Sequence, residues 1–110
     1  MALMAQIEKS ELLKQVKTAV LALAPNSEII LYGSRAKGTV HIDSDWDFLI
    51  LLPSPRNKTL EAQIKDRLYD VELETDTILS SIIRSKQEWR SARYAVLPLR
   101  QHIEQDGVSL

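Results

Sequence analysis

Apolar and polar residues follow two different periods along this chain, and each period predicts a type of element. From Ala5 to Leu23 apolar residues recur every three or four positions, which predicts a core-packing helix that Pro25 ends. The apolar runs 29–32 and 46–52 have the length and composition of buried strands. The first half of the chain is therefore predicted to run helix, strand, loop, strand.

The second half continues with a helix, a strand and short helices. A helical period resumes after a surface turn at Pro53, with its apolar face at Leu60, Ile64, Leu68 and Val71. We expect the next strand at about 76–84. Ser85 and Glu88 have the spacing of a helix capping box, which favours a structural role for Glu88. Pro98 suits the first turn of a last helix, and Gly107 suits its end.

Two carboxylates open the second apolar run and suggest a metal site. Successive strand side chains point to opposite faces, so Asp45 and Asp47 share one face, while Trp46 faces the other and is expected to pack. At about 3.3 Å per residue, the two Asp Cα atoms are roughly 7 Å apart, so their carboxylates can converge on hard cations. Mg²⁺ fits best, because it is usually held by one or two carboxylates together with substrate phosphates.

A glycine turn precedes these carboxylates and suggests a phosphate site. Gly33 and Gly38 permit a close approach of backbone amides to a phosphate, and Ser34 adds a hydroxyl donor. The glycine spacing resembles the start of a P-loop, but Thr39 stands where that motif requires lysine, so we reject it. Taken alone, such a turn is most often only a turn, and an Asp-x-Asp pair is often a solvated strand end.

Arg35 and Lys37 lie inside the same turn and could neutralise a polyphosphate. Arginine can grip a phosphate bidentately, whereas lysine acts as a point charge. Basic residues in a loop are more often solvated than bound to a ligand, and only their place in the turn favours a binding role. We therefore place Arg35 and Lys37 with Gly33 and Ser34 as candidate nucleotide-binding residues.

The combined motif resembles the minimal nucleotidyltransferases of the DNA polymerase beta-like superfamily. Their signature is a Gly-Ser-Arg-Ala-Arg-Gly turn followed by Ser-Asp-x-Asp, which here corresponds to 33–38 and 44–47. The resemblance implies an α/β (α+β) nucleotidyltransferase fold with a small mixed sheet flanked by helices. It also implies that Gly33 and Ser34 contact the triphosphate of ATP, and that Asp45 and Asp47 bind Mg²⁺ and are catalytic.

One position departs from the family pattern. Active members usually carry a third acidic residue on a neighbouring strand, facing the same metals. The equivalent positions here are Ile78 or Ser80, and neither is acidic. On a strand, the side chain of Asp76 would point to the same face as those of Ile78 and Ser80. Asp76 could therefore serve from the start of that strand, so it is the third candidate catalytic residue. Nucleotide binding is consequently better supported than catalysis.

Length and charge limit the substrates. The 110 residues predict a single domain, 1–110, too short for the additional nucleic-acid-gripping domains of template-directed polymerases. The net charge of −1 also disfavours an extended nucleic acid. The chain has no cysteine and no run long enough to span a membrane, so we expect a cytoplasmic protein that needs no membrane.

Two functions remain in competition, beside the simpler alternative of a scaffold that binds no nucleotide. The first is a Mg²⁺-dependent transfer of a nucleotidyl group, AMP from ATP, to a hydroxyl acceptor. By resemblance, the acceptor belongs to a HEPN-domain partner for which this chain is the antitoxin. The second is a catalytically weak or inactive nucleotide-binding protein that masks its partner. Oligomeric state stays open, and so does the role of apolar residues near the C-terminus, which either pack inside or form a partner surface: Tyr94, Val96, Leu97 and Leu99.

Overall fold

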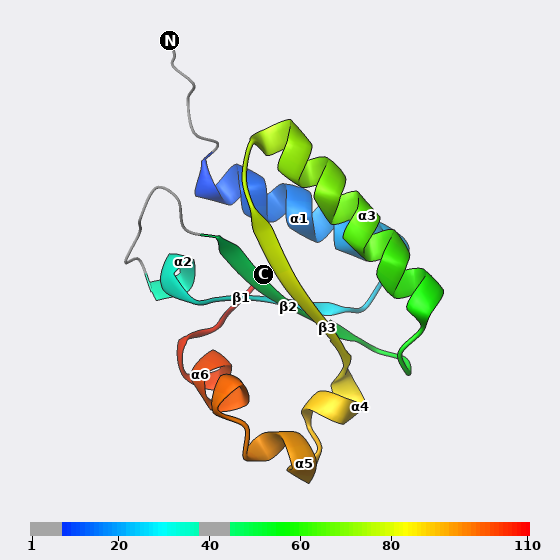
Figure 1. The fold of residues 1–110 in the computed structure, drawn as a ribbon, viewed down its shortest axis with the longest axis vertical. Coiled ribbons are helices and arrows are strands. Elements are labelled where there is room, and N and C mark those ends of the chain that lie inside the picture. Colours follow the sequence, from blue (N-terminus) through cyan, green and yellow to red (C-terminus); the bar gives the residue numbers. More distant parts are fainter. Residues whose placement is uncertain (1–7, 38–44) are drawn as a thin grey trace.

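The computed structural model describes residues 8–37 and 45–110. Helices and strands follow one another in the order shown in Figure 1. They are α1 (Lys9–Leu23), β1 (Glu28–Tyr32), α2 (Ser34–Lys37), β2 (Trp46–Leu52), α3 (Lys58–Thr75), β3 (Leu79–Ser85), α4 (Lys86–Trp89), α5 (Ala92–Ala95), α6 (Pro98–Asp106) and β4 (Val108–Ser109).

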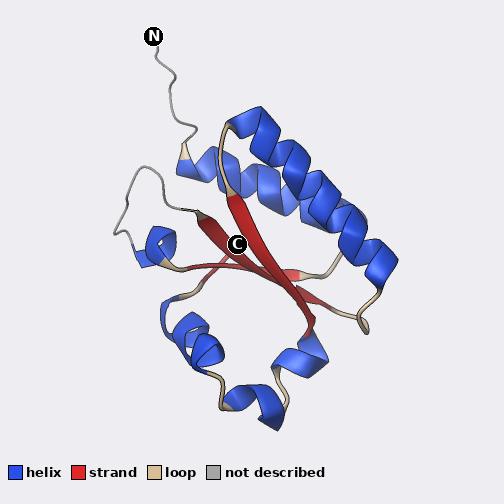
Figure 2. Ribbon diagram, viewed as in Figure 1, coloured by secondary structure: helices blue, strands red, loops and turns tan. Residues whose placement is uncertain are grey.

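The strands form one mixed sheet between the helices (Figure 2). Their order across the sheet is β3-β2-β1-β4. Strand β1 pairs antiparallel with both β2 and β4, whereas β2 pairs parallel with β3. A parallel pair needs a crossover connection, and α3 provides it. The small mixed sheet flanked by helices confirms the predicted α+β fold class.

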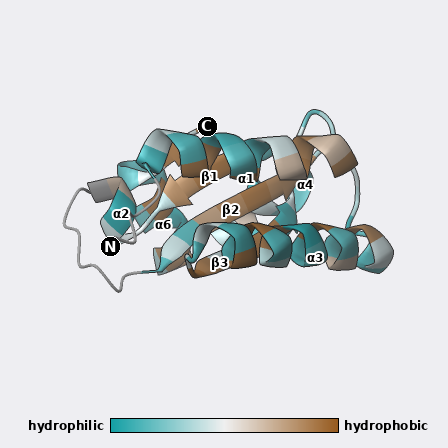
Figure 3. Ribbon diagram, turned by 90° about the horizontal axis from the view of Figure 1, so that it is seen from above, coloured by the Kyte–Doolittle hydropathy of each residue, from teal (hydrophilic) through white to brown (hydrophobic). Residues whose placement is uncertain are grey.

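The main hydrophobic core lies where α1 and α3 cover one face of the sheet (Figure 3). Alternate residues of β2, beginning with Trp46, contribute to this core and are at most 6% exposed. Val16 of α1 and Ile64 and Leu68 of α3 pack on them, as the helical spacing predicted, and Leu12 of α1 joins them although it was not predicted. The packing prediction for Trp46 is thus confirmed.

A second, smaller core covers the other face of the sheet. Leu49 and Leu51 of β2 pack here against Trp89 of α4 and Ile103 of α6. The sheet is therefore buried on both faces, which explains why 46–52 is an almost unbroken apolar run. Only the beginning of β2 departs from this pattern, because partly exposed Asp47 shares the face of the second core.

Most predicted element boundaries agree with the structure. The first helix ends at Leu23 as predicted and begins at Lys9 in the described part, while residues 5–7 lie outside it. Strand β3 begins at Leu79, three residues later than expected, because α3 continues to Thr75 and Asp76 then closes it with a left-handed backbone (φ 52°). Strand β4 follows the last helix and was not predicted.

The capping box at the start of α4 is present. The Ser85 hydroxyl accepts a hydrogen bond from the Glu88 amide at 3.0 Å, and the Glu88 carboxylate accepts one from the Ser85 amide at 3.0 Å. The structural role predicted for Glu88 is therefore confirmed. The last helix begins at Pro98 and is closed by Gly107, as the sequence also predicted.

The apolar residues near the C-terminus divide between the core and the surface. Tyr94 packs on the second core and makes an edge contact with the ring of Trp89, with ring centroids 6.0 Å apart. Val96, Leu97 and Leu99 are exposed by 74, 41 and 38%. None of the helices in the described part of the chain is both long and apolar enough to cross a membrane.

Candidate functional site

The candidate site includes a row of three side chains on neighbouring strands, at the end of the sheet where β2 begins. In the strand register, Asp47 of β2 pairs with Tyr32 of β1 on one side and with Ser80 of β3 on the other. Directly paired residues on neighbouring strands project from the same face of a sheet. Tyr32, Asp47 and Ser80 therefore lie side by side on the face opposite α1 and α3.

Gly33 brings the turn after β1 against the Asp47 carboxylate. Its backbone has φ +78°, a conformation that residues with a Cβ rarely adopt. A Cβ at this position would lie 2.5 Å from the Asp47 Oδ2 atom, which is closer than van der Waals contact allows. Glycine is thus required here for both its backbone freedom and its small size.

Burial and a neighbouring negative charge disfavour the ionised form of the Asp47 carboxyl group. Burial raises the pKa of Asp47, and the nearby negative charge of Asp45 raises it further. Burial likewise raises the pKa of the Tyr32 phenol, with an added contribution from the Asp47 charge. A cation bound between these groups would offset both effects, so the donor set of Asp45 and Asp47 fits a divalent metal ion.

Arg35 was predicted to bind the nucleotide, but its side chain stacks on Trp46. Its guanidinium carbon lies 4.4 Å from the centroid of the Trp46 ring, on the side of the sheet opposite the Asp47 carboxylate. Ser34 is the first residue of α2 and Lys37 is the last. The remainder of the loop, 38–44, lies outside the described residues.

The position expected for a third carboxylate is taken by Ser80. Ser80 pairs with Asp47 in β3, and the Ile78 carbonyl accepts a hydrogen bond from the Trp46 amide at 2.9 Å. Asp76 lies farther back along the chain, exposed at the end of α3. Within the described residues, no three His, Cys, Asp or Glu side chains gather in a group that could hold a metal.

Two residues near the site are not among the predicted site residues. Tyr32 is the last residue of β1, and its pairing with Asp47 becomes evident only when the strand register is known. Glu72 reaches from α3 to β3, where its carboxylate accepts a hydrogen bond from the Leu79 amide at 2.9 Å. Glu72 thus helps to hold β3 in place beside β2.

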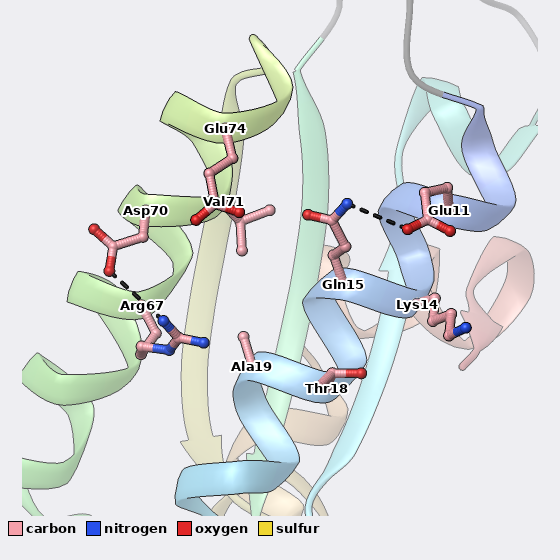
Figure 4. A pocket seen from close by; sticks show the side chains of 9 residues that line it. All are labelled: Glu11, Lys14, Gln15, Thr18, Ala19, Arg67, Asp70, Val71 and Glu74. Atoms are coloured by element: carbon pink, nitrogen blue, oxygen red, sulfur yellow. Dashed lines mark hydrogen bonds and ion pairs between the residues drawn. The ribbon is translucent and has the colours of Figure 1, made fainter.

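A separate cavity of about 240 Å³ lies between α1 and α3 (Figure 4). Its charged side chains are partly paired with neighbours on their own helices. Arg67 and Asp70 form an ion pair at 3.8 Å, and Gln15 donates a hydrogen bond to Glu11 at 3.4 Å. None of the candidate site residues lines this cavity, so we do not assign it to the nucleotide site.

Comparison with known proteins supports the fold and identifies the family of the chain. A nucleotidyltransferase-domain family model matches residues 13–102. No curated protein matches the chain. A toxin-antitoxin crystal structure with AMP-PNP is similar, with a TM-score of 0.62, 21% identity, and coverage of 87% of this chain and 69% of that one. A crystal structure of a mutant of the toxin-antitoxin MntA-HpeT has a TM-score of 0.58, 20% identity, and coverage of 96% and 72%.

Proposed function

Because the chain belongs to the nucleotidyltransferase-domain family, we propose that it transfers AMP from ATP to a hydroxyl acceptor in a Mg²⁺-dependent reaction. The observation that best supports this proposal is the contact between the turn glycine and the carboxylate. Gly33 leaves no room for a side chain beside Asp47, so a phosphate bound by the turn would lie next to the metal ligands. The two halves of the motif thus form one site.

The proposed roles rest on the sequence motif together with the contact between Gly33 and Asp47. The backbone at Gly33, the Ser34 hydroxyl and the charge of Lys37 bind the triphosphate, and Asp45 and Asp47 hold the metal. When bound, Mg²⁺ neutralises the phosphate oxygens and orients the groups that react. The acceptor oxygen forms a bond to the α-phosphorus and releases its proton to solvent water, while the bond to the β-phosphate breaks and pyrophosphate leaves.

We also propose that the acceptor hydroxyl belongs to a partner protein. Both similar crystal structures are of toxin-antitoxin proteins, one of them with AMP-PNP. Together with the sequence motif, this supports an antitoxin role in which a HEPN-domain protein is the partner. Such a reaction would take place in the cytoplasm, where ATP and Mg²⁺ are abundant.

A masking protein without catalysis is the second candidate function. Ser80 favours it, because this residue pairs with Asp47 where the family usually has a third carboxylate. Asp76 stays a candidate for that missing group, although it lies outside β3. A masking protein would still bind Mg²⁺ and ATP and would inhibit its partner without modifying it.

Transfer of label from α-³²P-ATP separates the two functions. We expect the purified chain with Mg²⁺ to label one macromolecule in a lysate of the source cell, and chelation of Mg²⁺ by EDTA to abolish the labelling. A chain that binds ATP with Mg²⁺ but transfers no label under these conditions would contradict the enzyme and support the masking protein. Direct calorimetry of ATP binding makes that distinction possible.

Substitution Ser80→Asp is expected to increase transfer by about tenfold, because it places a carboxylate beside Asp47 in the parallel register. Proton transfer by a well-placed group contributes about 10²- to 10⁴-fold in evolved enzymes, and a single substitution should recover part of that. Initial rates of label transfer measure the effect. Ser80→Asn is the matched control, and equal rates for the two variants would show that position 80 does not serve the reaction.

A further inference from the structure

Arg35 belongs to the turn after β1, residues 33–37, which we call the nucleotide turn, but it contacts the opposite face of the sheet. The 4.4 Å separation between its guanidinium carbon and the Trp46 ring centroid is well within the range of a cation–π contact. Trp46 is only 6% exposed and packs in the core covered by α1 and α3. Because Trp46 and Asp47 are consecutive strand residues, the stacked guanidinium and the Asp47 carboxylate are on opposite sides of β2.

Two further contacts hold the same segment from the core side. The Lys9 ammonium at the start of α1 donates a hydrogen bond to the Arg35 carbonyl oxygen at 3.3 Å. Ala36 is partly buried and packs against the main core. The helix α2 is therefore attached to α1 and to the first residue of β2, while Gly33 meets Asp47 on the other side.

We propose that Arg35 is a positioning residue, which stacks on Trp46 to hold the nucleotide turn against β2 and does not itself contact the phosphates. The inference rests on the nucleotide site proposed above. It replaces the direct phosphate contact expected for Arg35, because a guanidinium stacked on a buried indole is directed away from the face that carries Asp47. The stack sets the position of Gly33 relative to the carboxylates, and hence the affinity for ATP.

A double-mutant cycle between Arg35 and Trp46 tests the proposal. Calorimetry would measure Mg²⁺-ATP binding to the full chain as wild type, Arg35→Gln, Trp46→Leu and the double variant. We expect each single substitution to weaken binding by about three- to tenfold, as the loss of a partly buried cation–π contact implies. The double variant should bind as weakly as either single variant. Additive losses would overturn the proposal, because they would mean that Arg35 acts on ATP independently of Trp46.

A second measurement needs no nucleotide. In a Trp89→Phe background, the tryptophan emission comes from Trp46 alone. We expect Arg35→Gln to shift or intensify this emission, because it removes the charge stacked on the indole. Unchanged emission would overturn the stack. By contrast, a wild-type chain that stacks Arg35 but binds no Mg²⁺-ATP would overturn the proposed function.

A variant pair at position 35 keeps the test valid if Trp46→Leu does not fold. Arg35→Met retains a long apolar side chain that can cover the indole, whereas Arg35→Ala does not. If Arg35 works by packing on Trp46, the methionine variant should lose less ATP affinity than the alanine variant. Equal losses would overturn the proposal, since a phosphate ligand is removed completely by either substitution.

Discussion

Asp47→Asn is expected to reduce nucleotidyl transfer by about a hundredfold or more. Even residues that only support metal ligands typically contribute about 10- to 100-fold, and Asp47 is proposed as a ligand itself. It also lies against the nucleotide turn, since a Cβ on Gly33 would meet its Oδ2 atom. Label transfer from α-³²P-ATP measures the loss.

A suitable control is another aspartate that carries the same charge elsewhere. Asp70 is exposed on α3 and forms a 3.8 Å ion pair with Arg67. Asp70→Asn should therefore leave transfer unchanged. Undiminished transfer by Asp47→Asn would show that Asp47 does not hold a catalytic metal and would remove the main support for the proposed enzyme.

In the absence of metal, Asp47→Asn should not destabilise the protein. Burial and Asp45 raise the pKa of Asp47 in the folded state, so between the ordinary aspartate pKa and this raised value the folded chain binds more protons than the unfolded chain. The free energy of unfolding therefore decreases as pH rises through that range. Asp47→Asn removes the charge that causes the decrease, so its Tm at pH 7 should equal or exceed that of the wild type.

Thermal denaturation at several pH values tests the direction of this change in Tm. The difference in Tm between Asp47→Asn and the wild type should close below about pH 4, where an ordinary aspartate becomes protonated. Added Mg²⁺ should raise the Tm of the wild type and have little effect on the variant, because binding to the folded state stabilises it. A lower Tm for the variant at neutral pH would indicate that Asp47 is needed for folding.

Gly33→Ala is expected to damage both the fold and the nucleotide site. A residue with a Cβ held at positive φ costs about 1 to 3 kcal/mol, and the new methyl group would also collide with the Asp47 carboxylate. We expect Tm to fall by at least about 4 °C and ATP affinity to fall at least about tenfold, because the turn must move away from β2. Thermal denaturation and calorimetry measure the two effects.

Gly107 offers a matched control for this substitution. A Cβ at Gly107 would collide with the Ile103 carbonyl oxygen and with the Ile30 side chain, far along the chain from the nucleotide turn. Gly107→Ala should therefore lower Tm without a specific loss of ATP affinity at temperatures where it is folded. If both variants lose affinity equally, the effect of Gly33→Ala would come from general instability.

The sequence predicted much of the architecture because the apolar pattern of each element reflects the layers around it. The almost unbroken apolar run 46–52 corresponds to a strand covered on both faces, and the helical spacing of Ile64 and Leu68 corresponds to the covered face of α3. Local signals also sufficed for the capping box of Ser85 and Glu88, since their partners lie within one turn. Such features need no information about distant segments.

Strand pairing and cross-sheet contacts depended on segments far apart in the sequence. The two residues Val108 and Ser109 become β4 only because they reach β1, which no local pattern of such a short segment indicates. Strand β3 begins at Leu79, and its parallel register with β2 places Ser80 opposite Asp47. The single domain over 1–110 and the catalytic role of Asp76 stay predictions.

The sequence by itself determined which residues make up the candidate site, because the glycine turn and the two carboxylates lie within one short segment between two apolar strands. The alternation of strand side chains also determined that Asp47 and Trp46 face opposite sides. Only the tertiary structure decided which face of the sheet the Arg35 side chain contacts, since Trp46, on which it stacks, is buried in the core covered by α1 and α3. For the same reason Tyr32 joined Asp47, and Ser80 rather than Ile78 took the position beside it: register is set by the packing of whole strands, which the residues of one segment do not specify.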